Sequence, residues 1–219
     1  NLTSILIETS GATSMNSTFY NNDFVSFPAI VTDKVTNLTS CWQSSKELTS
    51  FPALNTSKVT MISYAWYECK KLTTFPTLDL TGCTEFTYTW GSCETMTSFP
   101  QLDFSNATYL FRVWYQCYGL GKDQEFPLID TSNVTFMEGT WFYNSGHKTF
   151  PKLNLDKCTG IKQAWYLNIG LTAFPAIDFP ACTDFTQAWA NCYVLKTFPQ
   201  VNVSNCLLYT SDAADDGLS

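Results

Sequence analysis

Cysteines are the residues of this chain with the most obvious chemistry, and they recur at two fixed places in a repeating unit. The first place holds Cys, Asn or Ser, and this interchange indicates a small buried side chain that hydrogen bonds to neighbouring backbone. The second holds Cys where Val or Ala stands elsewhere, which is typical of a small apolar filler. The first is filled by Cys69, Cys93, Cys117 and Cys192, with Ser45, Asn144 and Asn168, and the second by Cys83, Cys158 and Cys182.

These cysteines could form disulfides or bind zinc. The sequence favours neither as a function. Cys83–Cys93 and Cys182–Cys192 are the best candidates for disulfides, because both places are filled within one unit, but free thiols are the preferred interpretation. No C-x-x-C motif occurs, so a zinc knuckle is not expected. We predict no metal and no cofactor.

Groups for acid–base catalysis are sparse. His147 is the only histidine and takes the place of a core leucine, so we expect it to be structural. Carboxylates such as Asp79, Asp103 and Asp130 occur once per unit in a turn, and do not form a convergent pair. We therefore predict no catalytic residues and no enzymatic activity.

Two rows of side chains could form a binding surface. One is a row of threonines beside an expected strand, and the other is a set of tyrosines that flank the tryptophans. Tyrosine favours contacts with proteins or glycans because it joins an apolar ring to a polar hydroxyl. The candidate residues are Thr49, Thr73, Thr97 and Thr172, and Tyr64, Tyr67, Tyr88, Tyr115, Tyr143 and Tyr166.

A period of 24 residues positions all of these groups. Phe-Pro occurs at 27, 51, 75, 99, 126, 150, 174 and 198, so one interval of 27 interrupts intervals of 24. A weaker copy precedes the first, from about residue 5. Every tryptophan lies fifteen residues after one of these phenylalanines. They are Trp42, Trp66, Trp90, Trp114, Trp141, Trp165 and Trp189.

The period predicts a structural core built by stacking. One unit cannot close a core, but stacked units bring each side chain against its own copies. A buried indole hides about 150–250 Å², which corresponds to about 4–6 kcal/mol before conformational entropy is counted. We expect the seven tryptophans to form a continuous internal column.

The unit also predicts secondary structure. Leu-Thr-Ser-Phe segments, such as residues 48–51, are expected to form short strands of one parallel sheet. The recurrent threonine, as in Thr60, is interpreted as the N-cap of a short helical turn that carries the tryptophan. The alternative is a second strand, because residues 84–90 alternate at period two.

The two ends differ from the rest. Residues 206–219 resemble a translated sequencing adapter, so we interpret them as a non-native tail, while residues 1–205 form one repeat domain. The start, Leu2-Thr3-Ser4, matches Leu48-Thr49-Ser50, so the chain is expected to begin inside a repeat.

The stretch from Ser57 to Thr74, with its Ala-Trp-x-x-Cys-x-x-Leu pattern, resembles the bacterial surface-protein 26-residue repeat and BspA-like leucine-rich repeats. Trp replaces the family's Phe, and Phe-Pro replaces an aliphatic residue of its strand. Over residues 2–205 this resemblance implies an α/β solenoid: a right-handed, leucine-rich-repeat-like coil, with one parallel sheet of short strands and short helical or irregular turns opposite. It also implies display on a cell surface or virion, outside the cell.

Composition limits the function further. The net charge is −7 with one arginine, which disfavours nucleic-acid binding, and no apolar run is long enough to cross a membrane. The leading expectation is a non-enzymatic surface or fibre module that attaches to a protein or glycan on a host or neighbouring cell. The alternative is a purely structural spacer or stalk, and a third, ice binding through the threonine row, is disfavoured by Gln124, Lys148 and Lys196 in that row.

Overall fold

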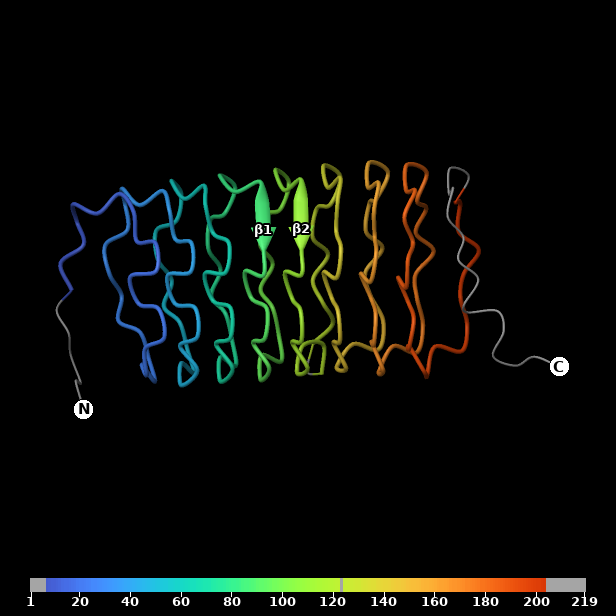
Figure 1. The fold of residues 1–219 in the computed structure, drawn as a ribbon, viewed down its shortest axis with the longest axis horizontal. Coiled ribbons are helices and arrows are strands. Elements are labelled where there is room, and N and C mark those ends of the chain that lie inside the picture. The colour runs from blue at the N-terminus through green and yellow to red at the C-terminus, as the bar shows by residue number, and fades with distance from the viewer. Residues whose placement is uncertain (1–6, 123, 204–219) are drawn as a thin grey trace.

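The chain winds into a stack of coils that runs from the blue end to the red end of Figure 1. The structure, a computed structural model, describes residues 7–122 and 124–203. Parallel bridges join equivalent residues of neighbouring coils, for example Ser26 with Ser50 and Gly160 with Asp184. The repeat of the sequence is therefore also a repeat in space.

In the part of the chain that the structure describes, regular secondary structure is confined to two short strands in the middle of the stack. Strands β1, Glu85–Thr87, and β2, Tyr109–Phe111, pair in parallel, with Phe86 opposite Leu110 (Figure 1). They belong to successive coils and follow the recurrent threonine. Single bridges such as Phe136 with Gly160 continue the same line of contacts into later coils.

The predicted leucine-rich-type α/β solenoid is wrong. Across residues 7–122 and 124–203 there is no helix, and the only sheet has two strands of three residues. The expected strand at Leu-Thr-Ser-Phe is reduced to isolated bridges, such as Ala173 with Thr197. The strands lie instead in the segment where a helical turn was preferred and a second strand was the alternative.

Main-chain hydrogen bonds explain why no helix forms around the tryptophans. The N–H of Trp42 donates to the oxygen of Ala65 in the next coil, at 2.9 Å, while its neighbour Cys41 donates to Leu38 within the coil, at 3.0 Å. Such bonds alternate along this part of the coils that are followed by another described coil. Every second main-chain N–H in this part thus donates to the next coil. The N–H groups between them donate to the residue three positions earlier and close four-residue turns, so the i to i−4 hydrogen bonds of a helix do not form.

Backbone conformation enforces these turns. Two residues four apart, as at Ser40 (φ 53°) and Ser44 (φ 61°), lie in the left-handed region, which cannot continue a right-handed helix. Positive φ at the third residue of a turn is the mark of type II turns, which usually place glycine there. Only one glycine, Gly139, fills either of these positions, so the sequence carries little sign of the turns. In the other coils the first position holds Ser17, Tyr64, Tyr88, Arg112, Gln163 and Gln187, and the second holds Asn21, Glu68, Ser92, Gln116, Tyr143, Leu167 and Asn191.

The recurrent threonine is not an N-cap. Its hydroxyl donates to the main-chain oxygen of the equivalent threonine one coil earlier, as from Thr60 to Thr36 at 3.3 Å and from Thr159 to Thr135 at 3.0 Å. The main-chain N–H of Thr159 makes the same connection at 2.8 Å. Threonine therefore recurs because it doubles the hydrogen bonding between coils.

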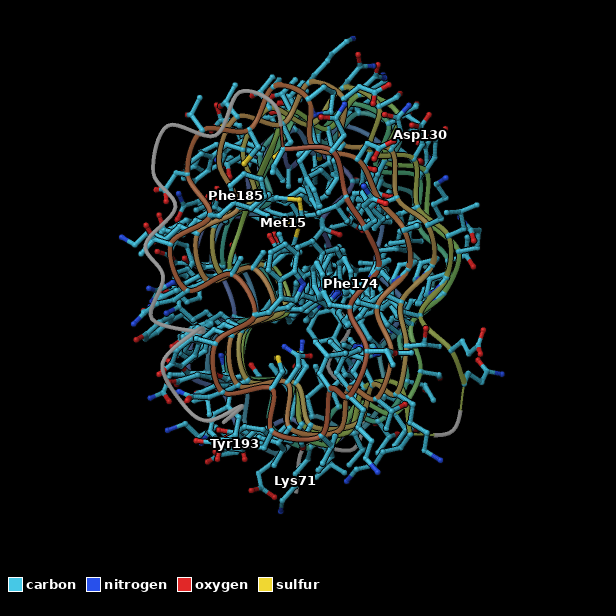
Figure 2. The ribbon with its side chains drawn as sticks, turned by 90° about the vertical axis from the view of Figure 1, so that its right-hand side faces the viewer. Met15, Lys71, Asp130, Phe174, Phe185 and Tyr193 are labelled. Carbon is cyan, nitrogen blue, oxygen red and sulfur yellow. The ribbon has the colours of Figure 1, made fainter. Side chains whose placement is uncertain are left out.

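The core is made of columns of like side chains. Successive indoles from Trp42 to Trp189 stack with ring centroids 5.4–5.9 Å apart and planes within 11° of parallel. The Phe-Pro phenylalanines form a second column that meets the indoles edge-on, as Phe75 meets Trp66 at 4.8 Å. Figure 2 looks along the stack and shows Phe174 and Phe185 inside the cross-section, with Lys71 and Tyr193 on its outer side.

Candidate functional site

The tyrosines that flank the tryptophans converge into one surface, which we call the aromatic face. Its rings are half-buried, and each contacts the next across coil boundaries. Tyr64 stacks on Tyr88 at 5.2 Å, and Phe142 stacks on Tyr166 at 4.8 Å. Tyr115 connects these two stacked pairs, because its ring contacts that of Tyr88 at 5.6 Å and also that of Phe142. The aromatic face comprises Tyr64, Tyr67, Tyr88, Phe111, Arg112, Tyr115, Phe142 and Tyr166.

Arg112 occupies the centre of the aromatic face. Its guanidinium carbon lies 5.3–5.9 Å from the centroids of four rings, those of Tyr88, Phe111, Tyr115 and Phe142. Its Nη1 donates to the hydroxyl of Tyr88 at 2.7 Å, and its buried Nε has no partner in the described part of the chain. The charge is held by cation–π contacts rather than by a carboxylate.

Two glycines make room for this arrangement. A Cβ on Gly91 would come within 3.0–3.1 Å of the rings of Tyr67 and Tyr88, and one on Gly139 would lie 2.9 Å from Cγ of Arg112. Each glycine replaces a side chain that would displace a ring or the arginine stem. The aromatic face is therefore packed to a fixed shape.

Tyr64 and Tyr67 keep their protons at neutral pH. Partial burial raises the pKa of Tyr64, with a further rise from Tyr88 that Arg112 opposes. Burial also raises the pKa of Tyr67. These two phenols therefore remain hydrogen-bond donors.

Sequence reasoning missed Arg112, Phe111 and Phe142. Arg112 stands thirteen residues after its Phe-Pro phenylalanine, where Tyr64 and Tyr88 stand in earlier coils. Phe142 likewise stands, one coil later, at the repeat position that Tyr115 occupies. A slot-by-slot comparison of the repeats would have included both. Of the predicted tyrosines, Tyr143 lies outside the aromatic face and contacts Tyr118 at 5.0 Å.

The threonine row is arranged as another ladder between coils. The hydroxyl of Thr73 donates to the main-chain oxygen of Thr49 at 3.2 Å, and that of Thr172 donates to Lys148 at 3.1 Å. Thr49 donates to Val25 in the same way. The main-chain N–H of Thr97 reaches Thr73 at 3.3 Å. Because these donors already serve the stack, the row has less capacity to bind a ligand.

Cysteines of the first place serve as donors in the core. Cys69 Sγ contacts the main-chain oxygen of Trp42 one coil earlier at 3.3 Å, and Asn144 Nδ2 donates to Trp114 at 2.8 Å. Burial raises the pKa of Cys117 to about 12, so the thiol stays protonated. No disulfide joins any two of the eight cysteines in the described residues, so neither Cys83–Cys93 nor Cys182–Cys192 is formed. Cys206 lies outside the described residues.

The single histidine of the sequence, His147, lies in the core. His147 is buried against Phe126 and Phe150, and both ring nitrogens lack partners there. Burial lowers its pKa to about 3, so the ring is neutral. Within residues 7–122 and 124–203 no group of His, Cys, Asp or Glu is arranged to hold a metal ion.

A hollow of about 580 Å³ lies elsewhere on the stack, along the turns that follow Phe-Pro. Its carboxylates are occupied by their own turns: Asp103 accepts a hydrogen bond from the N–H of Ser105 at 2.8 Å, and Asp130 accepts one from Ser132 at 2.9 Å. The hollow therefore offers no free pair of carboxylates.

Comparison with protein-family models, curated proteins and solved structures finds no match to this chain. No helix of the described residues has the length and apolar character to span a membrane.

Proposed function

We propose that the protein is a non-enzymatic attachment module, displayed on a cell surface or virion outside the cell, that holds a glycan against the aromatic face. The observation that carries the proposal is the unbroken series of ring contacts from Tyr64 to Tyr166, with Arg112 at its centre. A rigid row of phenols across several coils suits an extended chain of sugars, because both repeat along one direction.

Ring geometry indicates how the aromatic face would bind. Tyr64 and Tyr88 lie within 15° of parallel, and so do Phe142 and Tyr166 within 18°, so these neighbours cover each other's ring faces. Ring edges and hydroxyl groups are then the parts left for a ligand. A ligand rich in hydroxyl and ring oxygens can accept hydrogen bonds from them.

Tyr88 and Arg112 are the strongest donors of this surface. The oxygen of Tyr88 accepts a hydrogen bond from Arg112, so its own O–H proton remains available to a ligand. Tyr166 is similar, since its oxygen accepts from Asn191 Nδ2 at 2.8 Å. The guanidinium of Arg112 adds positive charge in the same place, which strengthens a hydrogen bond to a ligand oxygen.

A spacer or stalk is the second candidate function. The threonine ladders and the indole column serve contacts between coils, which is all that a spacer needs. Arg112 argues against this alternative, because a half-buried charge among four rings contributes less to stacking than a tyrosine would, such as Tyr88 at the same position of the preceding coil.

Glycan-array binding by the folded full-length chain tests the proposal. Tyr88→Phe, which removes only the hydroxyl, and Arg112→Gln should each weaken the best-bound glycan by at least about tenfold. Thr73→Val is the control on the threonine row and should leave binding unchanged. If Thr73→Val lost binding while the Tyr88 and Arg112 variants kept it, the glycan site would lie on the threonine row and not on the aromatic face. A folded chain that binds no glycan would overturn the proposal, and binding only to proteins would replace the ligand class.

A further inference from the structure

Arg112 lies among rings without an acidic partner. The sequence holds 19 acidic residues and this one arginine, yet none of the ion pairs of the described residues includes it. The main-chain oxygen of Glu138 accepts from the N–H of Arg112 at 3.0 Å, but its carboxylate lies 3.8 Å from Lys162. A guanidinium matches the paired oxygens of a carboxylate or phosphate, so the unmatched charge indicates a partner outside the chain.

Two donors with room for a ligand meet at this charge. Nη1 of Arg112 donates to the oxygen of Tyr88 at 2.7 Å, so the hydroxyl proton of Tyr88 is directed away from the arginine. Nη2 makes no hydrogen bond with the described residues and, unlike Nε, is not buried. An anionic group with two oxygens can accept from both donors and carries the opposite charge, whereas a sugar hydroxyl presents one oxygen and no charge.

The packing around Arg112 fixes these donors before a ligand arrives. A Cβ on Gly139 would lie 2.9 Å from Cγ of Arg112 and 3.3 Å from its Nε, so the arginine stem fills the space that this glycine leaves. The surrounding rings exclude water, and an opposite charge is attracted more strongly where water screens less. Donors that are fixed in advance also lose little conformational entropy on binding.

We propose that the ligand of the aromatic face is an acidic glycan, whose carboxylate or sulfate accepts hydrogen bonds from Nη2 of Arg112 and from the hydroxyl of Tyr88. This inference rests on the proposed function, because it concerns the same surface and adds the charge of the ligand. The net charge of the chain is −7, so an acidic glycan is attracted by this one residue and not by a basic surface. Arg112 lies midway along the series of rings, so the acidic sugar takes a middle place in the bound chain.

Titration calorimetry of the full-length chain with matched pairs of glycans tests this charge preference. One pair is oligogalacturonate and its methyl ester, and the other is a sulfated galactan oligosaccharide and its desulfated form, so the two pairs distinguish carboxylate from sulfate. In at least one pair the acidic member should bind at least about tenfold more tightly than the neutral one, and added salt should reduce this difference.

Three variants locate the charge that causes the preference. Arg112→Gln should bring both members of the pair to equal affinity, and Arg112→Lys, which keeps the charge but not the planar fork, should keep part of the difference. Lys152→Gln is the charge-matched control, because Lys152 is exposed on the turns that follow Phe-Pro, and it should behave like the wild type. A near-ultraviolet circular dichroism spectrum like that of the wild type shows that each variant is folded.

The comparison within a pair uses the wild type, so it does not depend on the folding of any variant. Equal affinity for both members of each pair overturns this inference and leaves the proposed function standing, because a neutral glycan still binds. A chain that binds neither the acidic nor the neutral members, nor any other glycan, overturns the proposed function and this inference with it. A preference for the acidic member that survives in Arg112→Gln also overturns the inference, because the anion is then held elsewhere.

Discussion

Nδ2 of Asn168 donates a hydrogen bond of 2.7 Å to the main-chain oxygen of Trp141, one coil earlier in the stack. Cys192 contacts the oxygen of Trp165 in the same way, with Sγ at 3.2 Å. This position of the repeat therefore needs a small side chain that donates one hydrogen bond. The amide brings a second polar atom, Oδ1, which is buried and has no partner among the described residues.

Asn168→Cys should therefore stabilise the protein by about 1 kcal/mol, because it keeps a donor and removes the unpaired oxygen. Asn168→Val should destabilise it by about 1–3 kcal/mol, because the oxygen of Trp141 loses its donor. Urea unfolding measures both changes as shifts of the midpoint at constant slope. Equal stability of the two variants would show that the hydrogen bond contributes nothing.

His147 should make stability fall in mild acid. Burial holds its folded pKa at about 3, against 6.5 when exposed, so below pH 6.5 the unfolded chain binds a proton that the folded chain excludes. This contribution is fully present above pH 6.5. At about 1.4 kcal/mol per pH unit, the loss between pH 6.5 and pH 5 is about 2 kcal/mol.

His147→Leu isolates this effect, because leucine fills the same place in other coils, for example at Leu72 and Leu171. The variant should be more stable than the wild type at pH 5 by a larger margin than at pH 7.5, as measured by urea unfolding. A margin that does not change with pH would mean that His147 has the same pKa in the folded protein as in the unfolded chain.

Gly170 should not tolerate a side chain. A Cβ there would lie 2.2 Å from the main-chain oxygen of Ser145 in the preceding coil. Gly170→Ala forces the two coils apart and should cost about 1–3 kcal/mol, the range of overpacked cores. Gly11→Ala is the control, because its Cβ would meet nothing within 4 Å. Thermal unfolding that ranks the two variants equally would contradict the close approach of these coils.

The position of an indole in the column should set its contribution to stability. Trp114 is fully buried between two other indoles, whereas Trp189 is half-buried with an indole on one side only. Trp114→Ala should cost about 3–5 kcal/mol, and Trp189→Ala clearly less. Chemical denaturation of the two variants measures the difference, and a larger loss at Trp189 would be inconsistent with the column.

Stacking could be predicted from the sequence because it depends on spacing alone. A strict interval places each Trp and each Phe-Pro phenylalanine over its copy, whatever the path of the chain between them. The local path was wrongly predicted for a specific reason. Residues other than glycine, such as Ser40 and Ser44, adopt the positive φ that these turns require. The glycines that usually reveal such turns in a sequence are therefore missing. Threonine was also misleading, since a residue typical of N-caps here links neighbouring coils.

The candidate site was predictable in part. Tyrosines were recognised by type, and the structure joins Tyr64, Tyr67, Tyr88, Tyr115 and Tyr166 in one surface. Arg112 was missed because its role comes from four rings that three different coils bring together. No spacing of the sequence shows that convergence until the coils are stacked in register.

Exciton-coupled circular dichroism of the indoles tests the central claim, that like side chains of successive coils touch, most directly. Parallel indoles 5.4–5.9 Å apart must couple, so the folded chain should give a strong indole couplet that is lost on unfolding. Trp114→Phe should reduce the couplet more than Trp189→Phe, because it removes two neighbouring contacts instead of one. Phenylalanine is a mild replacement here, since the indole N–H of Trp114 has no partner among the described residues. A folded chain without a couplet, or with equal losses in the two variants, would contradict the stack.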